Sequence, residues 1–219
     1  MAETQKVVPT SFRRLRRAEL PADTVSLARF LIGKVVVREL PCGRVAGRVV
    51  ETEAYPRRDP AAHHFRGVTP RNRAMFLRRG HAYVYFSYGN HFMLNVSAEV
   101  AGVGGGVLIR ALEPLEGIER MQERRGTTRR LDLARGPGRL ASALSIDRSL
   151  DGVDLCAAGP LWLGISERLL DPVDLRTGRP ALFVVAKSQR IGITRAAHRL
   201  LRFYERGNPF VSGPARLRL

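Results

Sequence analysis

The chain has 219 residues, of which 44% are hydrophobic, and a formal net charge of +17. This length and composition suit a single domain with a core of its own. The basic excess favours binding to nucleic acid or to an anionic membrane surface, whereas no apolar run is long enough to span a bilayer. Cys42 and Cys156 show no metal-ligand spacing and are interpreted as free thiols in a reducing cytoplasm.

Residues 1–20 are expected to form a basic N-terminal arm, followed by a single domain over residues 21–219. The first ten residues lack the apolar core of a signal peptide. The arm would either contact phosphate or present a solvated helix face. Its characteristic residues are four arginines and two leucines that would dock it: Arg13, Arg14, Arg16, Arg17, Leu15 and Leu20.

The first half of the domain reads as one helix and two strands. Asp23 is expected to cap a helix over residues 24–31. Strands are predicted over residues 34–40 and 44–55, with a turn between them. The loop that follows extends to residue 79, and a loop of this length in a compact domain is usually functional or disordered.

The second half is richer in strands. Gly89-Asn90 suits a tight hairpin, and Pro137 suits the first turn of a helix. Because many strands meet in hairpins and helices do not alternate with them, we predict an α+β fold: a single compact domain with a mostly antiparallel, curved β-sheet flanked by helices. Strands are expected over 82–88, 91–98, 107–112, 161–165, 182–186 and 201–204, helices over 114–125 and 137–144, and a mobile basic stretch over 124–135.

Carboxylates stand near the end of the strand over residues 44–55. Strict alternation places Val45, Val49, Glu51, Glu53 and Tyr55 on one face. Burial on such an apolar face would raise a carboxyl pKa and suit the group to general-base catalysis. The alternative is a strand end that emerges into solvent.

Two adjacent histidines, His63 and His64, lie in the long loop. No HExxH motif or cysteine pair accompanies them, so no metal is predicted, and stacking or hydrogen bonding by a neutral imidazole is favoured. A metal site would need further ligands from among Glu51, Glu53, His81 and His91.

Three tyrosines mark the predicted hairpin. Tyr83 and Tyr85 share one strand face, and a core position suits Tyr83. Tyr88 lies on the other face at the turn, beside Gly89. In a basic protein, an aromatic ring at such a turn suits a wedge or a stacking platform for nucleic-acid bases.

Asn95 and Arg110 interrupt apolar strands. Asn is disfavoured in strands and costly to bury unpaired, so its amide is a candidate for reading the edge of a ligand. Arg110 is either ion-paired, with Glu113 as the candidate partner, or directed at a phosphate. Gly136-Pro-Gly138 leaves backbone N–H groups open at a helix start, where a phosphate could bind near Arg135 and Arg139.

At these segments the chain resembles the alkyladenine (3-methyladenine/methylpurine) DNA glycosylase family, over about residues 21–212. The shared segments run in register along the chain: Val50-Glu-Thr-Glu-Ala-Tyr55, Ala61-Ala-His63, Thr69-Pro-Arg-Asn-Arg73, Tyr83-Val-Tyr85, Tyr88-Gly89, Asn95, Arg110-Ala-Leu-Glu-Pro-Leu-Glu-Gly117, Gly136-Pro137, Leu201-Arg-Phe-Tyr-Glu-Arg-Gly207 and Pro209. The turn from Tyr88 to His91 is more polar than in vertebrate members, and His64 is extra.

The resemblance implies a monofunctional glycosylase that flips alkylated or deaminated purines out of duplex DNA and hydrolyses the N-glycosidic bond. Candidate lesions are 3-methyladenine, 7-methylguanine, hypoxanthine and ethenoadenine. Glu53 would activate the attacking water, and Tyr88 would fill the gap in the duplex. Asn95 would exclude guanine through its 2-amino group, and Arg110 would hold backbone phosphate. The stacking pocket would be Tyr55, His63 and Tyr85, with further DNA contacts predicted for Thr69, Arg71, His91, Gly136 and Arg139.

The resemblance further implies no cofactor and no metal, and the lack of a lysine near the segment from Glu51 to Tyr88 predicts no lyase activity. The protein would act as a monomer on double-stranded DNA, in the cytoplasm of a prokaryote and in association with the nucleoid. Two other hypotheses stay open: a non-catalytic nucleic-acid-binding domain, for example for RNA, and a metal-dependent hydrolase that uses His63 and His64.

Overall fold

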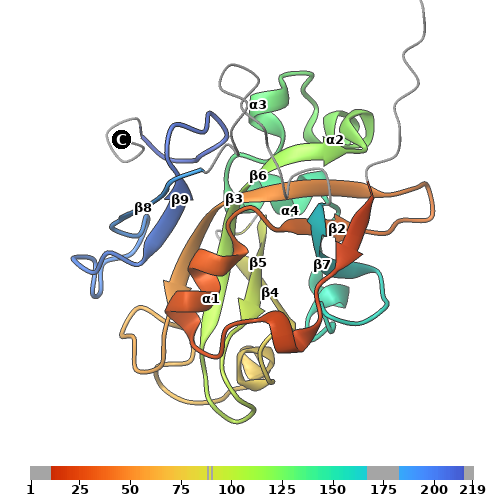
Figure 1. The fold of residues 1–219 in the computed structure, drawn as a ribbon. Helices are drawn as coiled ribbons and strands as arrows, with labels where there is room; N and C mark the ends of the chain where they lie inside the picture. Colours follow the sequence, from red (N-terminus) through yellow and green to blue (C-terminus); the bar gives the residue numbers. More distant parts are fainter. Residues whose placement is uncertain (1–10, 88, 90, 167–182, 215–219) are drawn as a thin grey trace, which may run out of the picture.

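The structure is a computed structural model that describes residues 11–87, 89, 91–166 and 183–214. The described residues form one open, antiparallel sheet of nine strands, against which four α-helices lie (Figure 1). The predicted α+β architecture with a mostly antiparallel sheet is therefore confirmed.

The sheet order is β1-β7-β2-β3-β6-β5-β4, and β9 pairs with both β3 and β8. The strands are β1 (Phe12–Arg14), β2 (Val35–Arg38), β3 (Val45–Tyr55), β4 (Ala82–Ser87), β5 (His91–Ser97), β6 (Gly106–Glu116), β7 (Leu161–Ser166), β8 (Val185–Ser188) and β9 (Arg202–Glu205). The α-helices are α1 (Thr24–Leu31), α2 (Ile118–Arg125), α3 (Arg130–Leu133) and α4 (Pro137–Ala143).

Strand β3 is central to the sheet. It pairs with β6 along one edge, and along the other it pairs first with β2 and then, from Glu51, with β9. The register with β6 shifts twice at this point, so that Val50 of β3 and Arg110 of β6 are extra residues. Such bulges bend a strand and change the face to which its side chains point.

The bulge changes the face occupied by the carboxylates. Val45 and Val49 lie in the main core, but beyond the bulge Ala54 lies there, and the Thr52 hydroxyl donates to the Ala28 carbonyl of α1 at 2.8 Å. Glu51 and Glu53 therefore lie on the opposite face. The prediction of a single face from Val45 to Tyr55 is wrong, because strict alternation does not allow for an extra residue.

Helix α1 has the predicted bounds and covers β3. The Asp23 side chain accepts hydrogen bonds from the backbone N–H groups of Val25 at 3.1 Å and Ser26 at 2.9 Å, as expected of an N-cap. Leu27 and Leu31 are fully buried in the main core. The helix thus closes the side of β3 that faces away from the carboxylates.

The region after β6 differs from the prediction. Strand β6 continues through Pro114 to Glu116, and α2 begins only after Gly117, which has a φ of 71°. Pro114 stands next to a register shift opposite Gly47, where a missing backbone donor is tolerated. The basic stretch expected to be mobile contains α3, whose Leu133 is buried.

Residues 12–20 of the expected arm lie on the domain. Strand β1 pairs with β7, Leu15 and Leu20 are buried, and Arg17 forms an ion pair with Asp154. Among the helices that the structure describes, none has the length and apolar character needed to cross a membrane.

Replacing Asp23 with Ala removes the side-chain acceptor at the start of α1. We expect the free energy of unfolding to fall by about 1 kcal/mol, the usual contribution of an N-cap. Urea unfolding measures it, and Asp23→Asn, which keeps an acceptor oxygen, should recover most of the loss. Equal losses in the two variants would contradict a capping role.

Candidate active site

A cavity of about 270 Å³ lies on the face of the sheet opposite the main core. Alternation along β5 separates the two sides: Leu94 and Val96 belong to the core, whereas Met93 and Asn95 line the cavity. The volume is close to the lower end of the range for ligand pockets, roughly 300–1,000 Å³. The cavity therefore suits one small, flat group.

One wall of the cavity is aromatic. The rings of Tyr83 and Tyr85 stack with centroids 5.3 Å apart, and the ring of His63 meets Tyr85 edge-on at 4.5 Å. His63 Nδ1 lies 3.0 Å from the Tyr83 hydroxyl. Although the His63 residue is exposed, desolvation of its ring against the tyrosines, and then the positive charge of Arg71, lower the pKa of His63, which leaves its ring neutral near pH 7.

The side chain of Asn72 organises the loop that carries His63. Its amide nitrogen donates to the carbonyls of His63 at 2.9 Å and Gly67 at 3.0 Å, and its amide oxygen accepts from the Thr69 backbone N–H at 2.7 Å. Asn72 is itself buried. The Thr69-Pro-Arg-Asn72 segment thus has a structural use that the sequence does not reveal.

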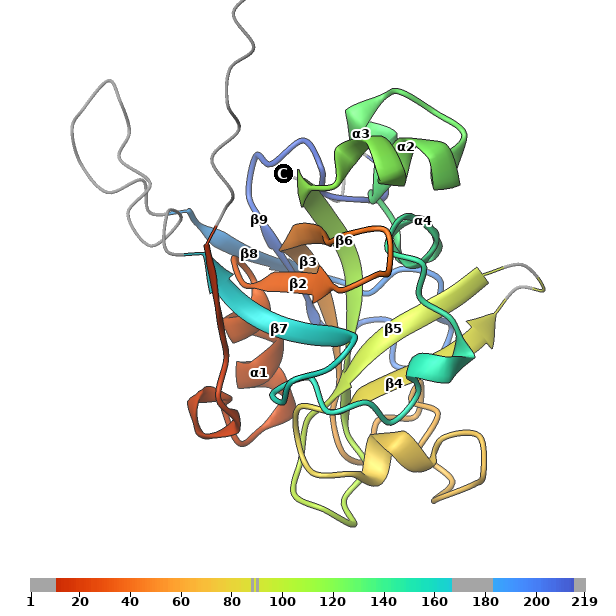
Figure 2. The same ribbon diagram turned by 90° about the vertical axis from the view of Figure 1, so that its right-hand side faces the viewer.

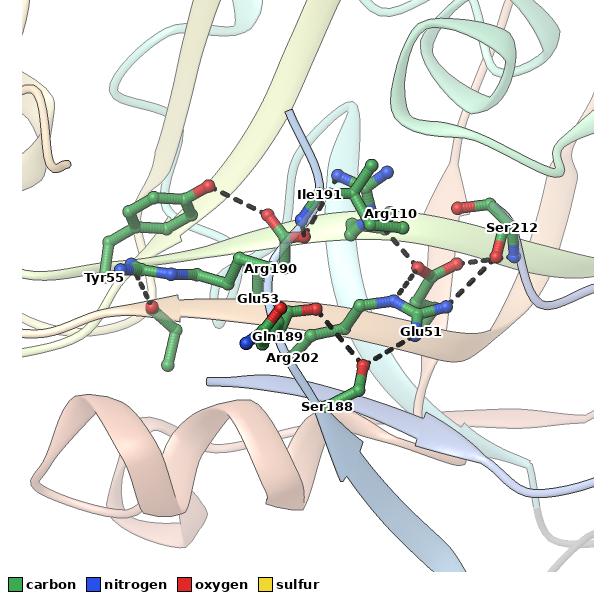
Figure 3. A network of polar contacts seen from close by, with 11 residues as sticks. Glu51, Glu53, Tyr55, Arg110, Ser188, Gln189, Arg190, Ile191, Arg202 and Ser212 are labelled. Atoms are coloured by element: carbon green, nitrogen blue, oxygen red, sulfur yellow. Dashed lines mark hydrogen bonds and ion pairs between the residues drawn. The ribbon is translucent and has the colours of Figure 1, made fainter. Parts of the chain in front are cut away.

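Glu53 is fully buried and has three partners (Figure 3). The Tyr55 hydroxyl donates to Oε2 at 2.8 Å, the Ile191 backbone N–H donates to Oε1 at 2.7 Å, and Arg110 Nη1 lies 3.2 Å from Oε1. Burial and the negative charge of Glu53 raise the pKa of Tyr55, so its phenol stays protonated and remains a donor. Tyr55, Arg110 and Ile191 all line the cavity.

Glu51 is the second buried carboxylate. It accepts from Arg110 Nε at 3.0 Å, from Arg202 Nε at 2.6 Å and from the Ser212 backbone N–H at 2.7 Å. Burial opposes ionisation, but the two guanidinium groups hold the pKa of Glu51 below its usual range. The expectation that burial would raise a carboxyl pKa on this strand is therefore wrong for Glu51.

Arg110 has two ion-pair partners within the site. Its guanidinium bridges Glu51 and Glu53, at 3.0 and 3.2 Å. The candidate partner Glu113 pairs instead with Arg48, at 2.5 Å. Arg110 is thus ion-paired within the site, and it also lines the cavity.

Arg190 was not identified from the sequence. Its guanidinium lies 4.5 Å from the centroid of the Tyr55 ring and pairs with the buried Asp59 at 2.8 Å. The next residue, Ile191, supplies the N–H that reaches Glu53. No periodic pattern in the sequence marks the loop that contains Arg190. Arg202, in contrast, is a charged residue within an apolar strand, as Arg110 is, and that pattern could have identified it.

Other predicted residues surround the cavity. Asn95 is buried in its wall and its amide donates to the Tyr83 carbonyl at 3.2 Å. His91 lies against the start of α4, since a Cβ on Gly138 would approach its ring to 2.7 Å. Gly136 precedes Pro137, which lines the cavity.

Three DNA contacts predicted from the sequence lie further out, and one lies outside the described residues. Thr69 is exposed, and Arg71 donates to the Phe86 carbonyl at 3.2 Å. Arg139 pairs with Asp132 at 3.0 Å. Tyr88, the predicted wedge, is not among the residues that the structure describes.

Metal ligands do not gather at this site. Within the described ranges, no group of three or more His, Cys, Asp or Glu side chains could hold a metal ion. The carboxylates behind the cavity, Glu51 and Glu53, are instead paired with arginines.

The family model for methylpurine-DNA glycosylase matches residues 18–209. The chain belongs to this family. A relative from Mesorhizobium japonicum is 62% identical over 203 residues, which are 93% of this chain and 92% of the relative. A relative from Paraburkholderia phytofirmans is 51% identical over 93% of this chain and 90% of its own. Both carry the name "Putative 3-methyladenine DNA glycosylase".

Membership confirms the resemblance found in the sequence. Methylpurine-DNA glycosylases are hydrolases of N-glycosyl bonds that act on DNA, so the cavity and its carboxylates belong to a DNA repair enzyme. A third relative, from Methanoculleus marisnigri, is 46% identical over 87% of this chain and 94% of its own, and has the same name.

The depressed pKa of Glu51 predicts a contribution to stability above its unfolded pKa, about 4.5, that is lost as the pH falls. In Glu51→Gln, the part of the unfolding free energy that depends on the titration of Glu51 should be absent. Removing one partner of a buried ion pair should also cost about 3–5 kcal/mol near pH 7.

Urea unfolding of both proteins between pH 3 and pH 7 tests this prediction. The exposed carboxylate of Glu123 provides the control, because Glu123→Gln changes the same charge and should keep the wild-type pH profile. An unchanged acid dependence in Glu51→Gln would show that other groups control it.

Proposed function

We propose that this protein excises alkylated or deaminated purines from duplex DNA by hydrolysing their N-glycosidic bond. The observation that carries the proposal is a buried carboxylate, Glu53, held directly behind an aromatic cavity of the size of one flat group. A base within a duplex cannot reach such a cavity. It must be flipped out, at a cost of a few kcal/mol.

The aromatic wall suits a damaged purine. Alkylation at N3 or N7 makes the base cationic, and cations are attracted to the faces of aromatic rings. We propose that Tyr55, His63 and Tyr85 hold the base, with His63 neutral. A cationic purine also leaves readily. The reaction therefore needs a water and a general base to activate it more than it needs a nucleophilic side chain.

Glu53 is proposed to activate that water. A carboxylate offers about four lone-pair positions. Hydrogen bonds from Tyr55 and Ile191 occupy two of them, and Arg110 forms an ion pair at 3.2 Å, which leaves at least one for a water on its way to the anomeric carbon. A well-placed general base accelerates such a step by roughly 10²- to 10⁴-fold. Glu51, with both oxygens bound, is assigned an electrostatic role.

Asn95 is proposed to discriminate against guanine. Its amide is buried and fixed by the Tyr83 carbonyl, so that it can oppose the 2-amino group of guanine without moving aside. We further propose that Tyr88 fills the gap left by the flipped base, and that the enzyme acts as a monomer on prokaryotic DNA without metal or lyase chemistry. Contacts to the backbone are proposed for Arg110, Thr69, Arg71, His91, Gly136 and Arg139.

Base release from methylated duplex DNA, measured in EDTA, tests the reaction. Wild type should release free 3-methyladenine, and Glu53→Gln should be roughly 10²- to 10⁴-fold slower while still binding the DNA. Glu123→Gln makes the same chemical change at an exposed position and should match wild type.

The other outcomes separate the competing hypotheses. Tight binding with no release by wild type would favour a binding module. Activity that disappears in EDTA would indicate a metal-dependent hydrolase, and strand nicking without alkali would indicate a lyase. Full activity of Glu53→Gln would show that another group acts as the general base.

A further inference from the structure

Arginines gather around a single carboxylate on α3. Asp132 of α3 lies 3.0 Å from Arg139 Nη1, 3.4 Å from Arg129 Nε and 3.5 Å from Arg135 Nη2. Together these four residues are called the Asp132 cluster. Arg125 of α2 is close enough to interact electrostatically with Arg139 and Asp132, and within the described part of the chain its buried Nε has no hydrogen-bond partner.

The cluster holds more positive charge than Asp132 can neutralise. Three arginines and one aspartate leave two positive charges, and Arg125 adds a third. The side chains of Arg129 and Arg139 are 77% and 45% exposed, whereas that of Asp132 is 20% exposed. Ion pairs this exposed contribute little to stability, so these arginines can exchange Asp132 for another anion at little cost.

Neighbouring arginines are used differently. Arg124 donates to the Ala143 carbonyl at 3.3 Å, and Arg130 donates to the Pro114 carbonyl at 2.8 Å. These two side chains join α2 and α3 to the domain. The arginines of the Asp132 cluster instead converge on the one acidic group.

The cluster lies on segments that also contribute residues to the cavity. The backbone of Arg135 forms an isolated β-bridge with Ala111, the residue after Arg110. Arg139 lies in α4, two residues after Pro137. Arg110 and Pro137 both line the cavity. Helices α2, α3 and α4 lie close together in the upper right part of Figure 2. An anion bound to the cluster would therefore be held by segments that also shape the cavity.

We propose that the Asp132 cluster binds a backbone phosphate of duplex DNA beside the extruded nucleotide, and that Asp132 stands in for this phosphate while the protein is free. The inference rests on the proposed function and extends it to Asp132, Arg129 and Arg135. Guanidinium groups match phosphate oxygens in a bidentate geometry. Because Asp132 repels the incoming phosphate, it lowers affinity for DNA in general.

The proposal predicts an unusual sign for a substitution in a DNA-binding surface. Asp132→Asn should bind undamaged duplex DNA about three- to fivefold more tightly at low salt, which is the effect of one unit charge a few ångströms away in water. The double variant Arg129→Gln with Arg139→Gln should bind more weakly, and its plot of log affinity against log salt should be shallower by about one.

Fluorescence anisotropy with an undamaged duplex over a salt series provides these values. The matched control is Glu119→Gln, which makes the same charge change at an exposed position of α2 outside the cluster, and its affinity should change less than twofold. Thermal unfolding of every variant verifies that it is folded.

Two results would overturn the inference. Weaker or unchanged binding by a folded Asp132→Asn would show that Asp132 is only a structural link between α3 and α4. If that variant does not fold, an unchanged salt slope in the double arginine variant would overturn it as well. Wild-type release of 3-methyladenine is measured in parallel, so that failure of the proposed function is recognised separately.

Discussion

The site depends on one buried ion-pair network, in which Arg110 bridges Glu51 and Glu53. Two carboxylates buried side by side would be strongly destabilising without compensating charge. Arg202 supplies the second positive charge, at 2.6 Å from Glu51, so that two carboxylates face two guanidinium groups (Figure 3). This balance compensates the charge of the two acidic side chains behind the cavity.

The paired bulges at Val50 and Arg110 make the network possible. Each strand gains one residue at the same level, so the sheet continues while both strands change the face they present. At this level β3 also exchanges β2 for β9, which brings Arg202 to Glu51. The aromatic wall needs no such device, because regular alternation along β4 already places Tyr83 and Tyr85 together.

Much of the fold could be predicted because it rests on local rules. The bounds of α1 follow from the Asp23 cap and the apolar spacing of its core residues. The antiparallel pairing of β4 with β5 follows from alternation in the two strands, whereas Asn90 of the predicted Gly89-Asn90 turn lies outside the described residues. The prediction was wrong where a nonlocal feature intervened, as at Pro114, whose place in β6 depends on a register shift opposite Gly47.

The sequence by itself determined which chemical groups this protein has and, through ordered motifs, its family. It marked Arg110 and Asn95 because polar residues in apolar strands need partners. Only the tertiary structure decided who those partners are. Glu53 receives its N–H from Ile191, 138 residues away, and Glu51 changes face at a bulge. Such contacts depend on how distant segments meet in space, and no local periodicity in either segment encodes that meeting.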